Sequence, residues 1–226
     1  AVEFGGRATG TAIVKTPFTN PDAYANLRVN DFTFEQGDMG TLVAGVRYNY
    51  EKGNVEIDAI ANDGQNIKTF VNGYISPKHN YIDLAIRAYN SRIEFIESFC
   101  GSFIHDVEAN ANGLLRVFGP LDNINLTGQM IANGNLSITP LNTTYTLRND
   151  TIRFLPDLIE FKADTVYDRN GNIGIVTGYL QHEHLTNLSY NLSIATRNLL
   201  AYDFKDFGNS SFCGTVYATG TCDIVG

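Results

Sequence analysis

The residues that could carry out chemistry in this chain of 226 residues are few and scattered. Its four histidines are His79, His105, His182 and His184. A nucleophilic side chain needs a general base beside it and a third group that orients the base. The sequence has no G-x-S-x-G motif, no phosphate-binding loop and no paired-cysteine metal motif. We therefore predict a protein that is not an enzyme and that uses no cofactor.

Two short segments have some features of metal sites. His182-Glu183-His184 would place both imidazoles on one face of a strand, but no third or fourth ligand can be identified, and a solvated loop also explains the pair. Asp168-Arg169-Asn170-Gly171-Asn172 has the oxygen spacing of half a calcium loop, with Asp164 nearby. Tyr179 stands where a calcium loop has its bidentate glutamate, which favours a hairpin turn. We predict no metal site.

Three cysteines, Cys100, Cys213 and Cys222, cannot form a fully paired set of disulfides. A bridge between Cys213 and Cys222 would require a hairpin that places them opposite each other. Buried free thiols are the simpler interpretation.

Composition and charge limit the class of protein. The 21 glycines, 12 tyrosines and 14 phenylalanines favour strands and tight turns. The net charge of -8 and the lack of basic runs argue against a nucleic-acid partner. No apolar stretch is long enough for a membrane-spanning helix, and the first residues do not resemble a signal peptide. The protein is therefore cytosolic, or these residues are a segment of a longer exported chain.

Alternation of apolar and polar residues is the dominant pattern, as in residues 42–50 and 81–88. Turn signals separate the alternating rows: EKGN, NDGQ, PKHN, NGN, RND and RNGN begin at residues 51, 62, 77, 133, 148 and 169. Only Ser91–Phe99 could be a short helical turn or an irregular crossing. The pattern predicts an antiparallel meander of many strands.

The chain also contains an internal repeat. ATGT occurs at Ala8–Thr11 and at Ala218–Thr221. The segment GYISPKHNYIDLAIRAYN, from Gly73, resembles GYLQHEHLTNLSYNLSIATRN, from Gly178, with Asn90 aligned to Asn198. We predict one elongated domain over 1–226, built from a unit at 10–112 and a unit at 113–226, within a longer chain.

Several motifs in the second half match a known family. They are Y-x-L-x-N-x-x-I-x-F from Tyr145, D-x-x-G-N from Asp168, G-x-[IL]-x-H from Gly178, and FCGTVYATG from Phe212. Over residues 113–226 the chain resembles the C-terminal region of the TamB family (translocation and assembly module), within the AsmA-like group, and most of all its Bacteroidetes type. Cys213 departs from the tyrosine expected there, and the likeness before residue 113 is general in style.

The resemblance implies a periplasmic β structure shaped like a folded taco, in a parent protein anchored in the inner membrane by a segment absent here. It also implies transport of phospholipid towards the outer membrane, a role in outer-membrane protein assembly and secretion, or both. The implied partners are phospholipid acyl chains and a TamA-like outer-membrane barrel protein. Neither role needs a catalytic residue.

The alternation itself is consistent with this fold class. A single sheet with one apolar face must cover that face by curling or by holding something apolar. We therefore predict an elongated antiparallel β-taco or incomplete barrel with an apolar groove. The residues predicted to line it are the apolar members of alternating pairs: Leu84, Ile86, Leu136, Ile138, Ile159, Phe161, Ile173, Ile175, Leu192 and Ile194.

Two alternatives remain open from the sequence. The apolar rows could meet in a closed β-sandwich that binds glycan or protein at the cell surface. The chain could also be a fragment of an outer-membrane barrel, although it lacks tryptophan and paired aromatic girdles.

Overall fold

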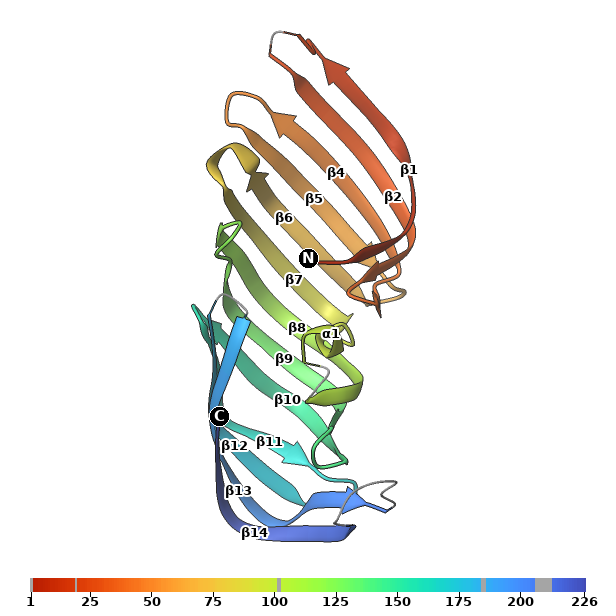
Figure 1. The fold of residues 1–226 in the computed structure, drawn as a ribbon. Coiled ribbons are helices and arrows are strands. Elements are labelled where there is room, and N and C mark those ends of the chain that lie inside the picture. The colour runs from red at the N-terminus through yellow and green to blue at the C-terminus, as the bar shows by residue number, and fades with distance from the viewer. Residues whose placement is uncertain (1, 19, 101–102, 184–185, 206–212) are drawn as a thin grey trace.

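The computed structural model describes residues 2–18, 20–100, 103–183, 186–205 and 213–226, without the side chains of 182–188. Within these ranges the chain forms one antiparallel sheet of 14 strands and one short α-helix, which confirms the all-β expectation (Figure 1). The elements in chain order are β1 (Phe4–Lys15), β2 (Asp22–Phe34), β3 (Gly37–Asp38), β4 (Thr41–Asn49), β5 (Asn54–Asn62), β6 (Lys68–Ser76), the 3₁₀ turn η1 (Pro77–His79), β7 (Tyr81–Arg92), α1 (Ile96–Cys100), β8 (Ile104–Pro120), β9 (Asn125–Ile138), β10 (Thr143–Leu155), β11 (Leu158–Tyr167), β12 (Ile173–Glu183), β13 (Thr186–Phe204) and β14 (Gly214–Val225).

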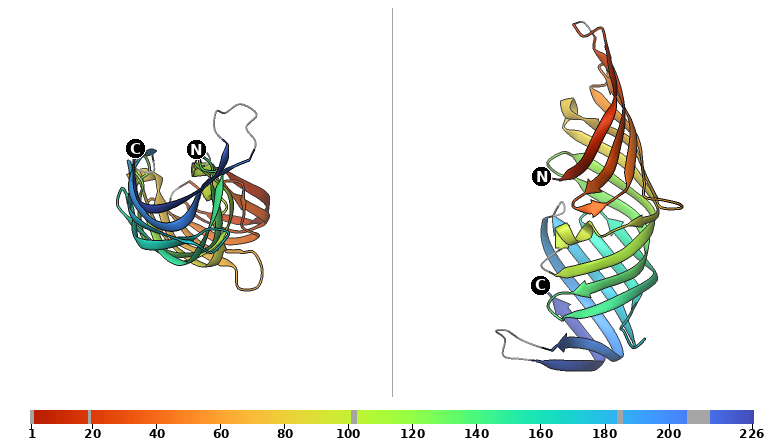
Figure 2. Two further views of the ribbon diagram at one scale, coloured as in Figure 1. Left: turned by 90° about the horizontal axis from the view of Figure 1, so that it is seen from below. Right: turned by 90° about the vertical axis from the view of Figure 1, so that its right-hand side faces the viewer.

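The sheet is a single layer with two free edges. Its strands follow one another in chain order from β1 to β14, and only β3 lies off this path, paired with β2. Seen along its long axis the sheet is U-shaped and open on one side (Figure 2). It is not closed into a barrel, and no second sheet packs against it in the described ranges. The architecture is therefore an elongated β-taco, and the two-sheet sandwich is not formed.

The connections agree only partly with the predicted turns. EKGN, NDGQ, PKHN and RNGN lie at hairpins, and the ambiguous segment Ser91–Phe99 contains the start of α1. The predicted turns at 133–135 and 148–150 are wrong, because these residues lie inside β9 and β10. Their Gly134 and Asn149 have positive φ angles of 134° and 58°, which bend a strand without ending it. No helix in the described part of the chain is long and apolar enough to span a membrane.

Bulges bend several of the strands. In β7, β10, β11 and β13 an extra residue enters the ladder at Asn90, Asn149, Ala163 and Asn198. Their φ angles are 49°, 58°, 59° and 55°. Each bulge increases the local twist and turns the strand towards one face. Together they contribute to curling the sheet into a trough.

Inward-facing glycines let neighbouring backbones approach closely. A Cβ atom on Gly73 would lie 2.0 Å from the carbonyl oxygen of Asp83, and one on Gly178 would lie 2.1 Å from that of Asn191. Their φ angles of 146° and 131° are ones that other residues rarely adopt. Gly73 is opposite Leu84 and Gly178 is opposite Leu192, so the two glycines occupy corresponding places in the two predicted repeat units. The division into units stays a prediction.

We predict that Gly178→Ala lowers the free energy of unfolding by about 2 kcal/mol or more, because the added carbon meets a backbone oxygen and the φ angle becomes strained. Gly45→Ala in β4 is the matched control, since the nearest atoms to its Cβ are 3.8 Å away and its φ is not positive. Urea unfolding of both variants measures the difference. Equal losses would show that the inward glycines do not set the curvature.

Candidate functional site

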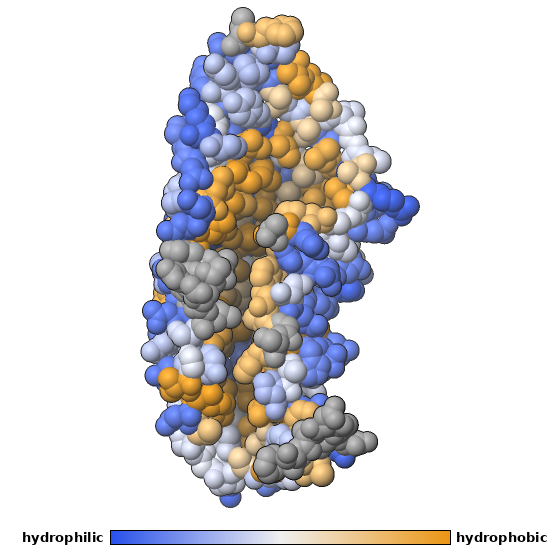
Figure 3. All heavy atoms as spheres, in the orientation of Figure 1, coloured by the Kyte–Doolittle hydropathy of each residue, from blue (hydrophilic) through white to orange (hydrophobic). Residues whose placement is uncertain are grey.

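The inner face of the trough is mostly apolar. Figure 3 shows apolar atoms gathered in a hollow that runs down the long axis between hydrophilic rims. Cross-strand pairing gives one row of this face, in which each residue lies opposite the next: Leu27, Ala44, Ala59, Val71, Ile86, Leu115, Gly128, Phe154, Ile159, Leu180 and Tyr190. No member of this row is charged.

The neighbouring row faces the other way and is mixed. It contains Arg28, Arg87, Gln129, Arg153, Glu160 and Asn191 among apolar residues. Since side chains of successive residues point to opposite faces of a sheet, the all-apolar row lines the hollow and the mixed row lies on the outer, convex face. We call the hollow the concave groove.

Small residues make up most of the buried positions of the concave groove. Ala88, Ala111 and Met130 form a buried cluster, and Ile93, Leu115 and Phe154 pack against it. Most of the larger aliphatic residues of the row stay only half-buried. This is expected of a face that no second layer covers, because each side chain has neighbours beside it but little above it.

The structure places eight of the ten predicted lining residues on the concave face: Leu84, Ile86, Leu136, Ile138, Ile159, Phe161, Leu192 and Ile194. Leu136 lies opposite Tyr145 and Ile138 opposite the buried Thr143, so these two are at a corner that the chain itself fills. Leu115, Phe154 and Leu180 belong to the same face but were missed by the sequence prediction. The alternation of apolar and polar residues in Leu115-Arg116-Val117 could have identified Leu115 as a lining residue.

The prediction for Ile173 and Ile175 is wrong. They lie opposite Arg197 and Ala195 on the convex face and are 43% and 41% exposed. The inward residues are Gly174 and Val176, and the Leu199 side chain packs over Gly174, with its Cδ2 2.8 Å from where a Cβ would be. An isoleucine could not occupy that inward position, so the larger residues face outwards.

Two aspartates interrupt the apolar face at the bulges. Asp150 and Asp164 follow the bulge residues of β10 and β11, and both are at least nine-tenths buried. Asp150 accepts hydrogen bonds from the backbone N–H groups of Arg148 and Thr165, both at 2.8 Å. Asp164 accepts one from Lys162 at 2.9 Å. Burial raises the pKa of Asp164, and the nearby Asp150 adds to the rise.

Within the described ranges, two aromatic contacts join elements that are not neighbours in the sheet, and the first is between Phe34 of β2 and Phe95, just before α1, whose ring centroids are 5.2 Å apart. The rings of Phe103, just before β8, and Tyr190 in β13 have centroids 6.5 Å apart. Four strands separate β8 from β13, a path of about 24 Å along the sheet, so the two side chains must meet over the concave side. The contact narrows the opening of the groove at mid-length.

A second crossing closes one corner of the C-terminal half. The pairing of β13 with β12 ends at Arg197, and the rest of β13 lies near the start of β10. There the Tyr145 hydroxyl donates a hydrogen bond to the carbonyl oxygen of Leu200 at 2.7 Å. Leu199 and Leu200 are 4% and 2% exposed. Here the chain's own side chains fill the trough, so the open apolar wall does not include this corner.

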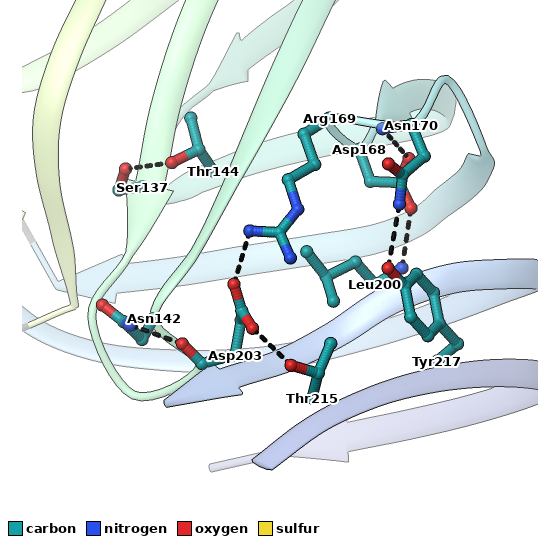
Figure 4. Close-up of polar contacts among 10 residues, drawn as sticks. All are labelled: Ser137, Asn142, Thr144, Asp168, Arg169, Asn170, Leu200, Asp203, Thr215 and Tyr217. Carbon is teal, nitrogen blue, oxygen red and sulfur yellow. Dashed lines mark hydrogen bonds and ion pairs between the residues drawn. The ribbon is translucent and has the colours of Figure 1, made fainter. Parts of the chain in front are cut away.

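Polar groups fasten this corner, and Figure 4 shows them. Asp203 of β13 bonds Arg169 at 2.5 Å and Thr215 at 2.7 Å, and its carbonyl oxygen accepts from the Asn142 side chain at 2.6 Å. Hydrogen bonding from Thr215 and the charge of Arg169 lower the pKa of Asp203. We call Asn142, Asp168, Arg169, Asp203 and Thr215 the clasp.

Asp168 caps its own turn as part of the clasp. Its carboxylate accepts from the backbone N–H groups of Asn170, Asn172 and Leu200 and from the Asn172 side chain, at 2.8 to 3.0 Å. Burial alone would raise the pKa of Asp168, but these hydrogen bonds outweigh it and lower the pKa. Because the turn and β13 use both oxygens, the hairpin interpretation of this segment is the correct one.

The remaining candidate residues are scattered. The His79 ring bonds Ser76 and the His105 ring bonds Thr139, and the side chains of His182 and His184 lie outside the described residues. Within the described part, no three His, Cys, Asp or Glu residues are placed to hold a metal ion. All three cysteines are free, but Cys213 and Cys222 are exposed and Cys100 is half-buried, so the expectation of buried thiols is wrong. Cys213 precedes β14 and Cys222 lies within it, about 30 Å further along the chain, so the two cannot be bridged.

Comparison with protein-family models, with curated proteins and with solved structures found no match for this chain.

The two buried aspartates with opposite pKa shifts give a matched prediction. At pH 7, Asp168→Asn should lower the free energy of unfolding by about 2 kcal/mol. The carboxylate accepts hydrogen bonds from backbone N–H groups through both oxygens, whereas an amide would turn an NH₂ donor towards some of these donors. Asp164→Asn should cause no loss, because a neutral side chain removes a charge that burial disfavours. Urea unfolding measures both variants.

The pH dependence has opposite signs for the two residues. The stability from Asp168 is present above the ordinary aspartate pKa of 3.8 and is lost as the pH falls through its lowered value. The contribution of Asp164 to stability is fully present below pH 3.8, the ordinary aspartate pKa, and is lost as the pH rises through the raised pKa of Asp164. A larger loss for Asp164→Asn than for Asp168→Asn at pH 7 would contradict this assignment.

Proposed function

We propose that the concave groove binds the acyl chains of phospholipids and serves as a segment of a lipid conduit in a bacterial envelope. The observation that carries this proposal is the uncharged row from Leu27 to Tyr190, which no second layer covers in the described structure. An apolar face of this extent gains free energy by leaving water. Acyl chains are flexible, apolar and long enough to follow a groove of this form.

The energetics favour a ligand that can slide. Each methylene moved out of water contributes about 0.8 kcal/mol, so half of a typical lipid tail contributes about 6 kcal/mol. Contacts with an apolar wall are non-directional, so they give no strong preference for one position along the groove. The hydrophilic rims leave a polar head group in water at the opening (Figure 3).

The resemblance to the TamB family supports the same proposal and extends it. It suggests a periplasmic location, a parent chain anchored in the inner membrane, and a TamA-like outer-membrane barrel protein as partner. A role in outer-membrane protein assembly rests on the resemblance alone. These extensions are proposals that follow from the sequence motifs of residues 113–226.

Two adjacent leucines give the test a matched pair. Leu115 lies in the apolar row of the concave face, whereas Leu114 faces outwards and is 53% exposed. A photo-crosslinking residue at position 115, in purified chain mixed with vesicles of phosphatidylethanolamine and phosphatidylglycerol, should capture phospholipid. The same residue at position 114 should capture at least tenfold less. Mass spectrometry of the crosslinked chain measures both yields.

The contradicting result is equal capture at the two positions, or capture at position 114 only. Far-UV circular dichroism of both labelled chains controls for folding. A soluble acidic glycan in place of the vesicles controls for non-specific labelling, and it should give background yield at both positions.

A further inference from the structure

The outer, convex face of the sheet has a hollow over three adjoining strands, β6, β7 and β8. Its volume is about 660 Å³, within the usual range of binding sites. Its lining includes Lys68, Phe70, Arg87, Tyr89, Asn112 and Leu114. Since these residues alternate along their strands with Ile86, Leu115 and other residues of the apolar row, they lie on the face opposite the concave groove. We call this site the convex hollow.

An aromatic pair and a leucine form the apolar part of the convex hollow. The rings of Phe70 and Tyr89 have centroids 5.8 Å apart and meet edge to face at 83°. Tyr89 is 47% exposed and Leu114 is 53% exposed, so both leave much of their apolar surface in water. Exposed aromatic and aliphatic side chains gathered around a hollow are typical of surfaces that dock another protein.

Two cations stand among these apolar side chains. Arg87 lies opposite Phe70 of β6 and Leu114 of β8. Lys68 lies opposite Tyr89. Side chains opposite each other in a ladder are about 5 Å apart, so each cation has an apolar neighbour where a carboxylate could stand. Within the described ranges neither cation forms an ion pair.

Two other arginines of the convex face do have acidic partners. Arg47 pairs with Asp22 at 3.3 Å, and Arg116 donates two hydrogen bonds of 2.8 Å to Asp83. The chain has a net charge of -8, so acidic side chains are in excess. Two unpaired cations in one hollow of such a chain present positive charge to an anion from outside.

The backbone beneath the convex hollow is not available to a ligand. β6, β7 and β8 are each paired on both sides, so their N–H and C=O groups are used within the ladder. A partner cannot add a strand here. It must be recognised by side chains, which again indicates the two cations and the apolar side chains beside them.

The surroundings of the convex hollow favour a protein over other anions. Leu114 would gain little beside the hydroxyl groups of a sugar but gains free energy beside an apolar side chain. An acyl chain needs a long apolar track, whereas the row beyond Leu114 continues with Gln129, Arg153 and Glu160. The net negative charge opposes nucleic acid.

We propose that the convex hollow docks an acidic segment of a partner protein, with carboxylates at Arg87 and Lys68 and an apolar side chain between Tyr89 and Leu114. A guanidinium can hold a carboxylate through two parallel hydrogen bonds. The oxygen of the Asn112 amide accepts from the backbone N–H of Asn90 at 2.8 Å. The proposal does not depend on what the concave groove carries, because the two sites are on opposite faces of the sheet.

Methyl NMR of the chain with a defined peptide tests the site. The probe is the acetylated and amidated peptide Glu-Glu-Phe-Glu-Glu-Leu, at concentrations up to about 5 mM. It should shift the methyl signals of Leu114 and leave those of Leu115, the adjacent residue on the concave face, unchanged. The neutral peptide Gln-Gln-Phe-Gln-Gln-Leu should bind about tenfold more weakly, and salt should weaken binding of the acidic peptide.

Variants that remove one charge separate the convex hollow from general attraction. Arg87→Gln and Lys68→Gln should each weaken binding of the acidic peptide about tenfold. Arg28→Gln is the matched control, because Arg28 is exposed on the convex face, has no ion pair in the described structure and lies outside the hollow. It should leave the affinity nearly unchanged. Urea midpoints of all three variants should equal that of the wild type, since no ion pair is broken.

Four results would overturn the proposal. They are no shift at Leu114 at the highest peptide concentration, shifts at Leu115 alone, equal binding of the neutral peptide, and equal weakening by Arg28→Gln and Arg87→Gln. Vesicles of phosphatidylglycerol give a further comparison. Shifts at Leu114 with these vesicles and none with the acidic peptide would assign the convex hollow to a lipid head group instead.

Discussion

The structure depends on one continuous antiparallel ladder, because no second layer packs on either face in the described part of the chain. Most contacts of each strand are with its neighbours in the sheet, so the curvature comes mainly from within the strands. Inward glycines such as Gly73 and Gly178, together with the bulges, provide it. The same bends that curl the sheet keep its apolar face on the inside, where it is half-sheltered and still accessible.

The crossings at the clasp and at Phe103 have different physical roles. At the clasp, an ion pair ties β13 to the turn between β11 and β12, and hydrogen bonds tie it to Asn142 and to Tyr145 of β10. Leu199 and Leu200 are buried there, so this corner behaves as a small closed core. At mid-length only the rings of Phe103 and Tyr190 meet, a contact of a kind that contributes about 1 kcal/mol. The first crossing stabilises the fold, whereas the second is a weak contact between two side chains.

Local alternation predicted the correct face where an apolar residue has polar neighbours in sequence, as Leu192 has in Asn191 and Ser193. It failed from Ile173 to Val176, because neither of the two alternating sets of residues there is polar. Which set faces inwards depends on contact with Leu199, a residue distant in sequence. Residues 133–135 and 148–150 were wrongly predicted to be turns. Glycine and asparagine adopt positive φ angles in turns and also in strand bulges, so the residue types alone do not distinguish the two. No local pattern could reveal the bond from Tyr145 to Leu200, since it links residues 55 positions apart.

The most direct test of the account is a methyl NMR spectrum of the chain with stearate that carries a nitroxide near its tail end. The nitroxide broadens the signals of nearby protons, so it reports which face the acyl chain occupies. The account predicts strong broadening of the concave methyl groups of Leu84, Ile86, Leu115 and Leu192, with those of Leu114, Ile173 and Ile175 left sharp. Equal broadening of both sets, or broadening of the convex set alone, would contradict it.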